Sequence, residues 1–434
     1  MTLKRTYVWG WGLGSVGLAV VHNTLNVLLM AYLIRVVGIE PALAGTIVLS
    51  TKLIDVLTDM PVGWLSDRTR TSMGRRRPYL LAAAIVTPFA AYTLFSAGPG
   101  GQTQAIISLL LLSAAGYTLF NVPYLSMPAE MTKSPDVRTH MVGVRSSAIA
   151  LGTLFGISAA PIIVGQLGGG AAGYNGLALI MAIAIFVAFI GSFLSLKGAP
   201  DHAAGHPPAA LWQQLKSIVK GRSYQMLLAI KILHLLGLAV GAGSLLFFFT
   251  GALRYDATML GIYGMVTTLT WTVVMPLWTR LANTIGKRKG YMLATTLYTL
   301  VTLSWLLAEP QEPMAQLYGR AFLFGILSGG MLLMGNGMLQ DIMDDDFRKH
   351  GERRNGVFAA SYSLTEKITS GIAAQILGFI LAYTGYQRGA AEQSAEAVSG
   401  LYFTVGFVPA VCMGASLLFI YYYTLHEDDL REQS

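Results

Sequence analysis

Charged side chains are scarce in this sequence. Asp, Glu, Lys and Arg make up only 12% of its 434 residues, whereas hydrophobic residues make up 54%. Soluble domains usually carry about 25% charged residues. The hydrophobic residues gather in repeated stretches of about 20 or more, the length needed to cross a bilayer. The composition therefore excludes an ordinary soluble domain and predicts a polytopic helical membrane protein.

Cysteine is nearly absent, because Cys412 is the only one. A disulfide framework and a thiolate metal site are therefore excluded. The sequence also lacks the HExxH, GxSxG and GxxxxGKS/T patterns of metalloproteases, serine hydrolases and nucleotide hydrolases. These absences argue against an enzyme, and no cofactor is expected.

Hydropathy predicts twelve membrane-spanning helices and hence an all-α membrane protein embedded in a lipid bilayer. The predicted spans are residues 9–34, 42–65, 78–97, 103–128, 140–165, 174–196, 224–252, 258–280, 290–308, 314–341, 356–384 and 399–424.

Lysine and arginine are distributed unevenly among the segments that join these spans. One alternate set of segments holds most of them, including the runs 75–77 and 287–289, whereas the opposite set holds Arg35, Arg254 and Arg388. Because cytoplasmic loops carry the excess of Lys and Arg, both termini are predicted to lie in the cytoplasm, with the chain in the cell (inner) membrane. The net charge of +8 then reflects loop topology, and no nucleic-acid partner is expected.

The chain divides near its middle into two similar halves. The Pro/Gly/Ala-rich stretch GAPDHAAGHPPAA leaves six spans on each side, and GRRRPY after span two is echoed by GKRKGY after span eight. A duplicated six-helix unit with a solute site near the midplane is the major facilitator plan. We predict two pseudo-symmetric six-helix bundles, 1–197 and 224–425, joined by a cytoplasmic linker 198–223 and followed by a cytoplasmic tail 426–434.

Acidic residues interrupt the second span. Asp55 and Asp59 lie four residues apart, and Lys52 precedes Asp55 by three, so all three share one stripe of a helix. Ionised groups at mid-bilayer are costly and usually functional. Two close carboxylates and the hydroxyl of Thr58 predict a site for a coupling cation, either Na+ or H+. The alternative is a neutralised Lys–Asp cluster that holds helices together.

Other polar groups within the spans are candidates for binding a solute or balancing charge. In span four, Thr118 and Asn121 lie one turn apart, and Tyr117 and Tyr124 offer aromatic rings. Spans one, five and eleven add another set: His22, Asn23, Asn26, Arg145 and Lys367. Polar seams between packed helices are the alternative interpretation for each of them.

Charges also gather at the cytoplasmic ends of the spans. Asp67, Arg68, Arg75 and Arg76 predict an interhelical charge lock that acts as a gate, or a cluster that only fixes topology. The acidic run after span ten, within 340–354, has three consecutive aspartates rather than the alternating acids of a calcium loop. It predicts a cytoplasmic charge network instead.

Three stretches resemble the glycoside–pentoside–hexuronide:cation symporter family. They are DVLTDMPVGWLSDRTRTSMGRRRPYLL, NVPYLSMPAEMTKSPDVRTHMVGVRSS and the combination of QDIMDDDF with GERRNGVFAASYSLTEK. The resemblance implies sodium- or proton-coupled uptake of a sugar by alternating access. It also implies cation-site roles for Asp55, Asp59, Thr58 and Thr118, and roles near the solute and cation for Arg145 and Lys367.

The sequence departs from this family at the positions that bind the sugar in the family. The sugar-binding acid of span four is replaced by Asn121, a nearby tryptophan by Leu125, and the lysine–aspartate pair of span one by Leu18 and Ala19. A sugar substrate is thus implied by the resemblance alone. The alternatives are symport of an amphiphilic or lipid-like solute and a non-transporting sensor on the same fold. A monomer is expected.

Overall fold

The computed structural model describes residues 3–132, 134–200, 218–219, 221–351, 354–390, 392–423 and 425, and these residues form helices without any strand. The chain divides into two compact units. The first unit comprises Met1–His206, Tyr255–Ile262 and Tyr386–Ala391; the second comprises Pro207–Arg254, Tyr263–Gly385 and Glu392–Ser434. Most of the predicted linker 198–223 and the whole tail 426–434 lie outside the described residues, so those domain bounds stay a prediction.

The twelve predicted spans are confirmed. Within the described residues, twelve helical segments are long and apolar enough to cross a membrane. They are Arg5–Val37, Pro41–Arg68, Arg77–Phe95, Gln102–Met131, Asp136–Gln166, Gly170–Ser195, Arg222–Gly251, Ala257–Ile285, Lys287–Leu307, Met314–His350, Gly356–Tyr383 and Ala395–Tyr421. Each contains most of the apolar stretch that predicted it, and the chain is an all-α membrane protein.

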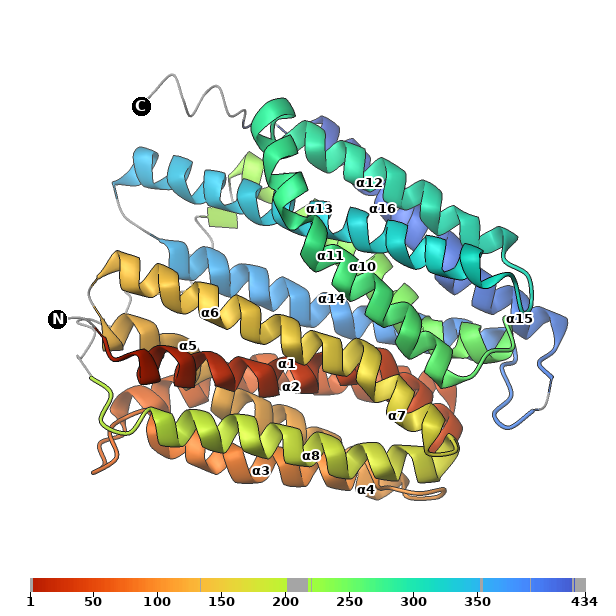
Figure 1. The fold of residues 1–434 in the computed structure, drawn as a ribbon, viewed down its shortest axis with the longest axis horizontal. Helices are drawn as coiled ribbons and strands as arrows, with labels where there is room; N and C mark the ends of the chain where they lie inside the picture. Colours follow the sequence, from red (N-terminus) through yellow and green to blue (C-terminus); the bar gives the residue numbers. More distant parts are fainter. Residues whose placement is uncertain are drawn as a thin grey trace. The chain divides into compact units, whose positions relative to one another are not determined.

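The first unit contains the first six spans, coloured red to yellow in Figure 1. Helix α1 packs against α6 and α8, and α3 packs against α8, so these helices enclose much of the unit's buried core. In chain order the elements are α1 (Arg5–Ala31), η1 (Tyr32–Val37), α2 (Pro41–Arg68), α3 (Arg77–Phe95), α4 (Gln102–Leu110), η2 (Leu111–Tyr117), α5 (Thr118–Met131), α6 (Pro135–Leu154), η3 (Phe155–Ala159), α7 (Ala160–Gln166) and α8 (Gly170–Ser195).

The second unit contains most of the last six spans, in green to blue. Helix α10 packs against α14 and α16, and α12 packs against α13 and α16. In chain order the elements are α10 (Arg222–Gly251), α11 (Ala257–Ile285), α12 (Lys287–Leu303), η4 (Ser304–Leu307), α13 (Met314–His350), α14 (Asn355–Tyr383), α15 (Ala395–Tyr402), η5 (Phe403–Phe407) and α16 (Val408–Tyr421).

Two helices run further than the apolar pattern predicted. Helix α13 continues to His350, so most of the acidic run 340–354 is helical rather than loop. Its last turn holds Arg348, Lys349 and His350, whose charges complement the negative end of the helix dipole, and Gly351 ends it at a positive φ of 73°. Helix α2 likewise includes Asp67 and Arg68 in its last turn. Charged residues can extend a membrane helix because water solvates them beyond the bilayer.

Four of the spans contain a π-helical segment, namely η1, η2, η3 and η5. A π turn inserts one extra residue into a helix and often lies at a functional site. Segment η2 ends at Tyr117, immediately before Thr118. It therefore sets the orientation of one of the residues predicted to bind the cation.

Candidate cation and solute site

Helix α2 carries both candidate carboxylates of the cation site. Asp55 is buried and Asp59, one turn further along, is partly buried. The helix continues through Pro61, so the two acids share one face as their spacing predicted. Because burial raises the free energy of a charged carboxylate, the pair is suited to a partner that carries positive charge.

Thr118 lies against this acidic face. Its hydroxyl is fully buried within the first unit and donates to Asp59 Oδ1 at 3.2 Å. The backbone carbonyl of Ser113, five residues earlier, accepts from the same hydroxyl at 3.3 Å. Segment η2 brings this carbonyl within reach, since a π turn aligns residues five apart. The hydroxyl has one proton, so it donates to only one of these two acceptors at a time. When it donates to the Ser113 carbonyl, its oxygen lone pairs are available to a cation bound between it and Asp59.

The Thr58 hydroxyl bonds to the backbone of its own helix, and its role as a cation ligand stays a prediction. The hydroxyl donates to the backbone carbonyls of Ile54 at 3.0 Å and Asp55 at 3.2 Å. The proton is thus held by its own helix, and the oxygen keeps its lone pairs. No group of three or more His, Cys, Asp or Glu residues that could hold a metal occurs among the described residues. Two carboxylates and two hydroxyls supply hard oxygen ligands of the kind that a cation such as Na+ binds, and one carboxylate is enough for a proton.

Tyr124 is held inside the first unit. Its ring stacks on Trp11 with 4.8 Å between the centroids, and its hydroxyl lies 2.6 Å from Ser15 Oγ. The same hydroxyl donates to the Trp11 carbonyl at 2.7 Å. The guanidinium of Arg145 lies beside this hydroxyl. The Tyr124 side chain is buried, which favours the alternative of a packing seam between helices, and its contact with a solute stays a prediction.

The two asparagines of span one make contacts of different kinds. Asn23 Nδ2 donates to the Ala19 carbonyl at 2.9 Å and to Thr153 Oγ1 at 3.2 Å, which makes it part of a seam between α1 and α6. Asn26 is exposed and lies 3.0 Å from His22 Nε2. Asn26 is therefore the better placed of the two to meet a solute.

The remaining solute candidates are divided between the units. Asn121 and Tyr117 are partly buried and belong to the first unit, and Lys367 is partly buried in α14 of the second. Lys367 follows Glu366, whose carboxylate pairs with Lys231 at 3.5 Å. This ion pair joins α10 to α14.

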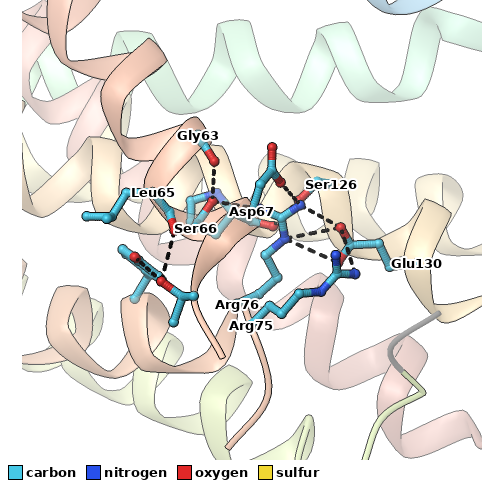
Figure 2. A network of polar contacts seen from close by, with 11 residues as sticks. Gly63, Leu65, Ser66, Asp67, Arg75, Arg76, Ser126 and Glu130 are labelled. Carbon is cyan, nitrogen blue, oxygen red and sulfur yellow. Dashed lines mark hydrogen bonds and ion pairs between the residues drawn. The ribbon is translucent and has the colours of Figure 1, made fainter. Parts of the chain in front are cut away.

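A charge lock joins three helices at the end of the first unit where α2 finishes (Figure 2). Arg76 precedes α3 and is only 8% exposed. Its guanidinium contacts Glu130 at 2.6 Å, Asp67 at 2.5 Å and the Ser66 hydroxyl at 2.6 Å. Burial lowers the pKa of Arg76, but Glu130 and Asp67 outweigh that effect and raise it above its usual value. We call Ser66, Asp67, Arg76 and Glu130 the first lock.

The predicted gating residues do not all join this lock. Arg75 lies 3.6 Å from Glu130, at its edge. Arg68 instead places its guanidinium over the Trp64 ring, 3.9 Å from the centroid. Glu130, the buried centre of the lock, was not predicted from the sequence. The sequence did contain a clue to it. Glu130 lies near the end of span four, and Asp341 lies at the corresponding place near the end of span ten.

The second unit has a matching pair. Lys287, the first residue of α12, contacts Asp341 of α13 at 2.5 Å. Further along α13, Asp346 pairs with Arg354 and lies 3.2 Å from His350. The charge network predicted within 340–354 is therefore present. We call Lys287 and Asp341 the second lock.

A family model described as MFS/sugar transport protein matches residues 10–427 of the chain. The chain is 26% identical over 424 residues to the putative glycoside/cation symporter YagG of Escherichia coli (strain K12), covering 96% of this chain and 91% of that protein. It is 27% identical over 416 residues to the isoprimeverose transporter of Lactiplantibacillus pentosus, covering 92% and 85%.

A solved structure has the same fold. That structure, of a bacterial homologue of the human drug peptide transporters PepT1 and PepT2, matches with a TM-score of 0.72 at 11% identity. The match covers 100% of both chains.

Proposed function

The chain belongs to the family of MFS/sugar transport proteins, and on this premise we propose that it is a cation-coupled symporter of a sugar or glycoside. The observation that carries the proposal is the contact of Thr118 with Asp59, one turn from the buried Asp55. These residues supply two carboxylates and a hydroxyl inside a span, where an uncompensated charge is costly. The names of the relatives favour a sugar over an amphiphilic solute and transport over sensing.

Coupling follows from the charge of this site. Excluding water from two carboxylates is costly, because burial disfavours their charged forms. A bound cation offsets part of this cost, so a conformation that excludes water from the site becomes more accessible. A solute that binds best to the cation-loaded protein then moves with the cation by alternating access.

The choice between Na+ and H+ rests on the hydroxyls. A proton needs only one carboxylate, whereas Na+ also uses neutral oxygen lone pairs. We propose Na+ at Asp55 and Asp59, with Thr118 as a third ligand. Support comes from the Ser113 carbonyl, which can accept the Thr118 proton and so free the hydroxyl lone pairs for a cation held by the carboxylates.

We propose that the solute meets Asn121, Arg145, Asn26 and Lys367, with the locks acting on the opening of the transport path. The protein is proposed to act as a monomer in the cell membrane with both termini in the cytoplasm. Support for that orientation is the uneven distribution of Lys and Arg between alternate loops.

Transport into proteoliposomes tests the proposal. Isoprimeverose and related neutral glycosides should accumulate when an inward Na+ gradient is imposed, and an ionophore that collapses it should stop the accumulation. Asp59→Asn should abolish coupling, while Asp136→Asn, an exposed acid in the first turn of α6, should transport as the wild type does. Gradient-independent uptake, or full coupling in Asp59→Asn, would contradict the cation site.

A second measurement separates the two ions. Sodium at constant ionic strength should raise the unfolding temperature of the purified protein, and both Asp59→Asn and Thr118→Val should lose this rise. If a proton gradient alone drives uptake and sodium leaves the unfolding temperature unchanged, coupling is to H+ and the sodium assignment is wrong.

A further inference from the structure

Two acid–base pairs of the second unit differ in their surroundings. Lys231 of α10 and Glu366 of α14 are 3.5 Å apart. The ammonium of Lys231 also lies 3.8 Å from the centroid of the Tyr362 ring. The Glu366 side chain is 45% exposed. This pair is loosely held and open on one side.

The other pair, Arg320 and Glu312, is closed. The Glu312 side chain is 1% exposed, and the Arg320 guanidinium contacts it directly. Arg320 Nε donates to Ser304 Oγ at 3.0 Å, and its guanidinium lies 4.8 Å from the Trp305 ring centroid. Buried charges surrounded in this way are expected of a pair that maintains the fold.

A contribution to the stability of the fold does not explain the presence of the Lys231–Glu366 pair. An ion pair in which one partner is half-exposed contributes little to stability. Placing ionisable groups inside a span costs more free energy than such a pair returns. Acidic groups within spans face the bundle interior or a water-filled cavity rather than lipid in nearly all cases, so we expect the half-exposed Glu366 carboxylate to meet water. A solute could then reach the pair.

We propose that Lys231, Glu366 and the ring of Tyr362 form a subsite for the sugar ring of a neutral glycoside. The Glu366 carboxylate accepts hydrogen bonds from sugar hydroxyls, and the Lys231 ammonium donates to hydroxyl oxygens. The edge of the Tyr362 ring offers apolar contact to sugar C–H groups. Because the two charges cancel, the subsite favours a neutral sugar over an acidic one, which Glu366 repels.

A buried layer fixes the position of this subsite. His234 lies one turn after Lys231 on α10, and its Nδ1 is 2.7 Å from the Tyr291 hydroxyl. Its Nε2 is 3.1 Å from Ser416 Oγ. These contacts tie α10 to α12 and α16, so the Lys231 side chain starts from a rigid backbone. This inference rests on the proposed sugar transport and names where part of the solute binds.

Thiol labelling tests water access without any ligand. In a Cys412→Ser background, Glu366→Cys should react with a membrane-impermeant methanethiosulfonate supplied on both sides of the bilayer. The control is Phe379→Cys, an exposed apolar position on the same helix. Its rate of reaction should be at most about one tenth of the rate for Glu366→Cys. Equal, slow labelling at both positions would overturn the subsite, whatever the protein transports.

Sugar binding tests the ligand class. Glu366→Gln and Lys231→Met should weaken the binding of isoprimeverose about tenfold or more, because each loses hydrogen bonds to a charged group. Both should keep the wild-type unfolding temperature and its sodium dependence. The matched control, Glu312→Gln, should unfold at a lower temperature yet bind isoprimeverose with wild-type affinity while folded.

The outcomes separate the two proposals. Wild-type affinity in both Glu366→Gln and Lys231→Met overturns the subsite and leaves sugar transport standing. If the wild type neither binds nor accumulates neutral glycosides, the proposed sugar function fails, and the ligand class of the subsite fails with it. Stronger binding of a glucuronide than of the matching neutral glycoside would also overturn the assignment.

Discussion

The first and second locks are formed by similar sequence motifs but differ in the contacts that their basic residues make. In the first unit, a nearly buried arginine joins α2, α3 and α5 through two carboxylates and a hydroxyl. In the second, a lysine that is 31% exposed joins α12 and α13 through the Asp341 carboxylate. A repeated motif thus fixes where charge is placed, while the neighbouring residues decide how much of the fold depends on it.

The roles within the motif are shifted by one residue between the units. GRRRPY and GKRKGY align at Gly74 and Gly286, yet the lock uses Arg76 in one and Lys287 in the other. The next residue shows the same shift: Arg77 donates to the Phe193 carbonyl at 3.2 Å, and Arg288 donates to the Ile420 carbonyl at 3.0 Å. Helix α12 begins directly after its glycine, whereas α3 begins two residues later, which explains the offset.

Removing the central acid of the first lock should have the largest effect. Glu130→Gln leaves the Arg76 charge buried with one partially exposed acid, and we expect a loss of about 3–5 kcal/mol in stability. The unfolding temperature in detergent micelles measures it. If Glu130→Gln and Asp341→Asn unfold at the same temperature, the two locks contribute equally to stability, which would contradict the difference expected from their burial.

Exchanging arginine and lysine sharpens the comparison. Arg76→Lys loses the planar group that contacts three partners at once, and we expect a cost of about 1–3 kcal/mol. The reciprocal Lys287→Arg has solvent around it and should stay within about 0.5 kcal/mol of the wild type. Chemical unfolding of both variants provides the measurement, and equal costs would contradict the role of geometry in the first lock.

Breaking the second lock should cost less. Asp341→Asn removes the carboxylate that Lys287 contacts, but water can hydrate the ammonium, so about 1 kcal/mol is expected. A double-mutant cycle with Lys287→Met isolates the pair from other effects of each change. A coupling energy as large as that between Arg76 and Glu130 would refute the distinction.

The smallest effect is expected at the edge of the first lock. Arg75 lies 3.6 Å from Glu130 and adds to a carboxylate that Arg76 already holds at 2.6 Å. Arg75→Met should therefore change stability by about 0.5 kcal/mol or less. The same unfolding assay checks it, and a loss comparable to that of Glu130→Gln would make Arg75 a full member of the lock.

Local pattern was enough to predict the spans and the placement of Asp55 and Asp59, because hydropathy and helical spacing act over neighbouring residues. The contact of Thr118 with Asp59 was predicted only through the family resemblance.

The partners of the ion pairs were harder to predict from the sequence. Glu130 and the Lys231–Glu366 pair depend on how helices far apart in sequence pack, and no spacing rule selects their partners. Segment η2 is also invisible to composition, because a π turn uses the same apolar residues as the α-helix around it.

The length of α13 has a mechanical consequence. Its 37 residues span about 55 Å at 1.5 Å per residue, whereas the hydrocarbon core of a bilayer is about 30 Å thick. The part that continues past the predicted span 314–341 carries Asp346 and the basic last turn on one continuous helix. When α13 tilts, the displacement of a residue grows with its distance from the pivot, so His350 moves furthest. A spectroscopic probe attached there would report such tilting more sensitively than one inside the membrane.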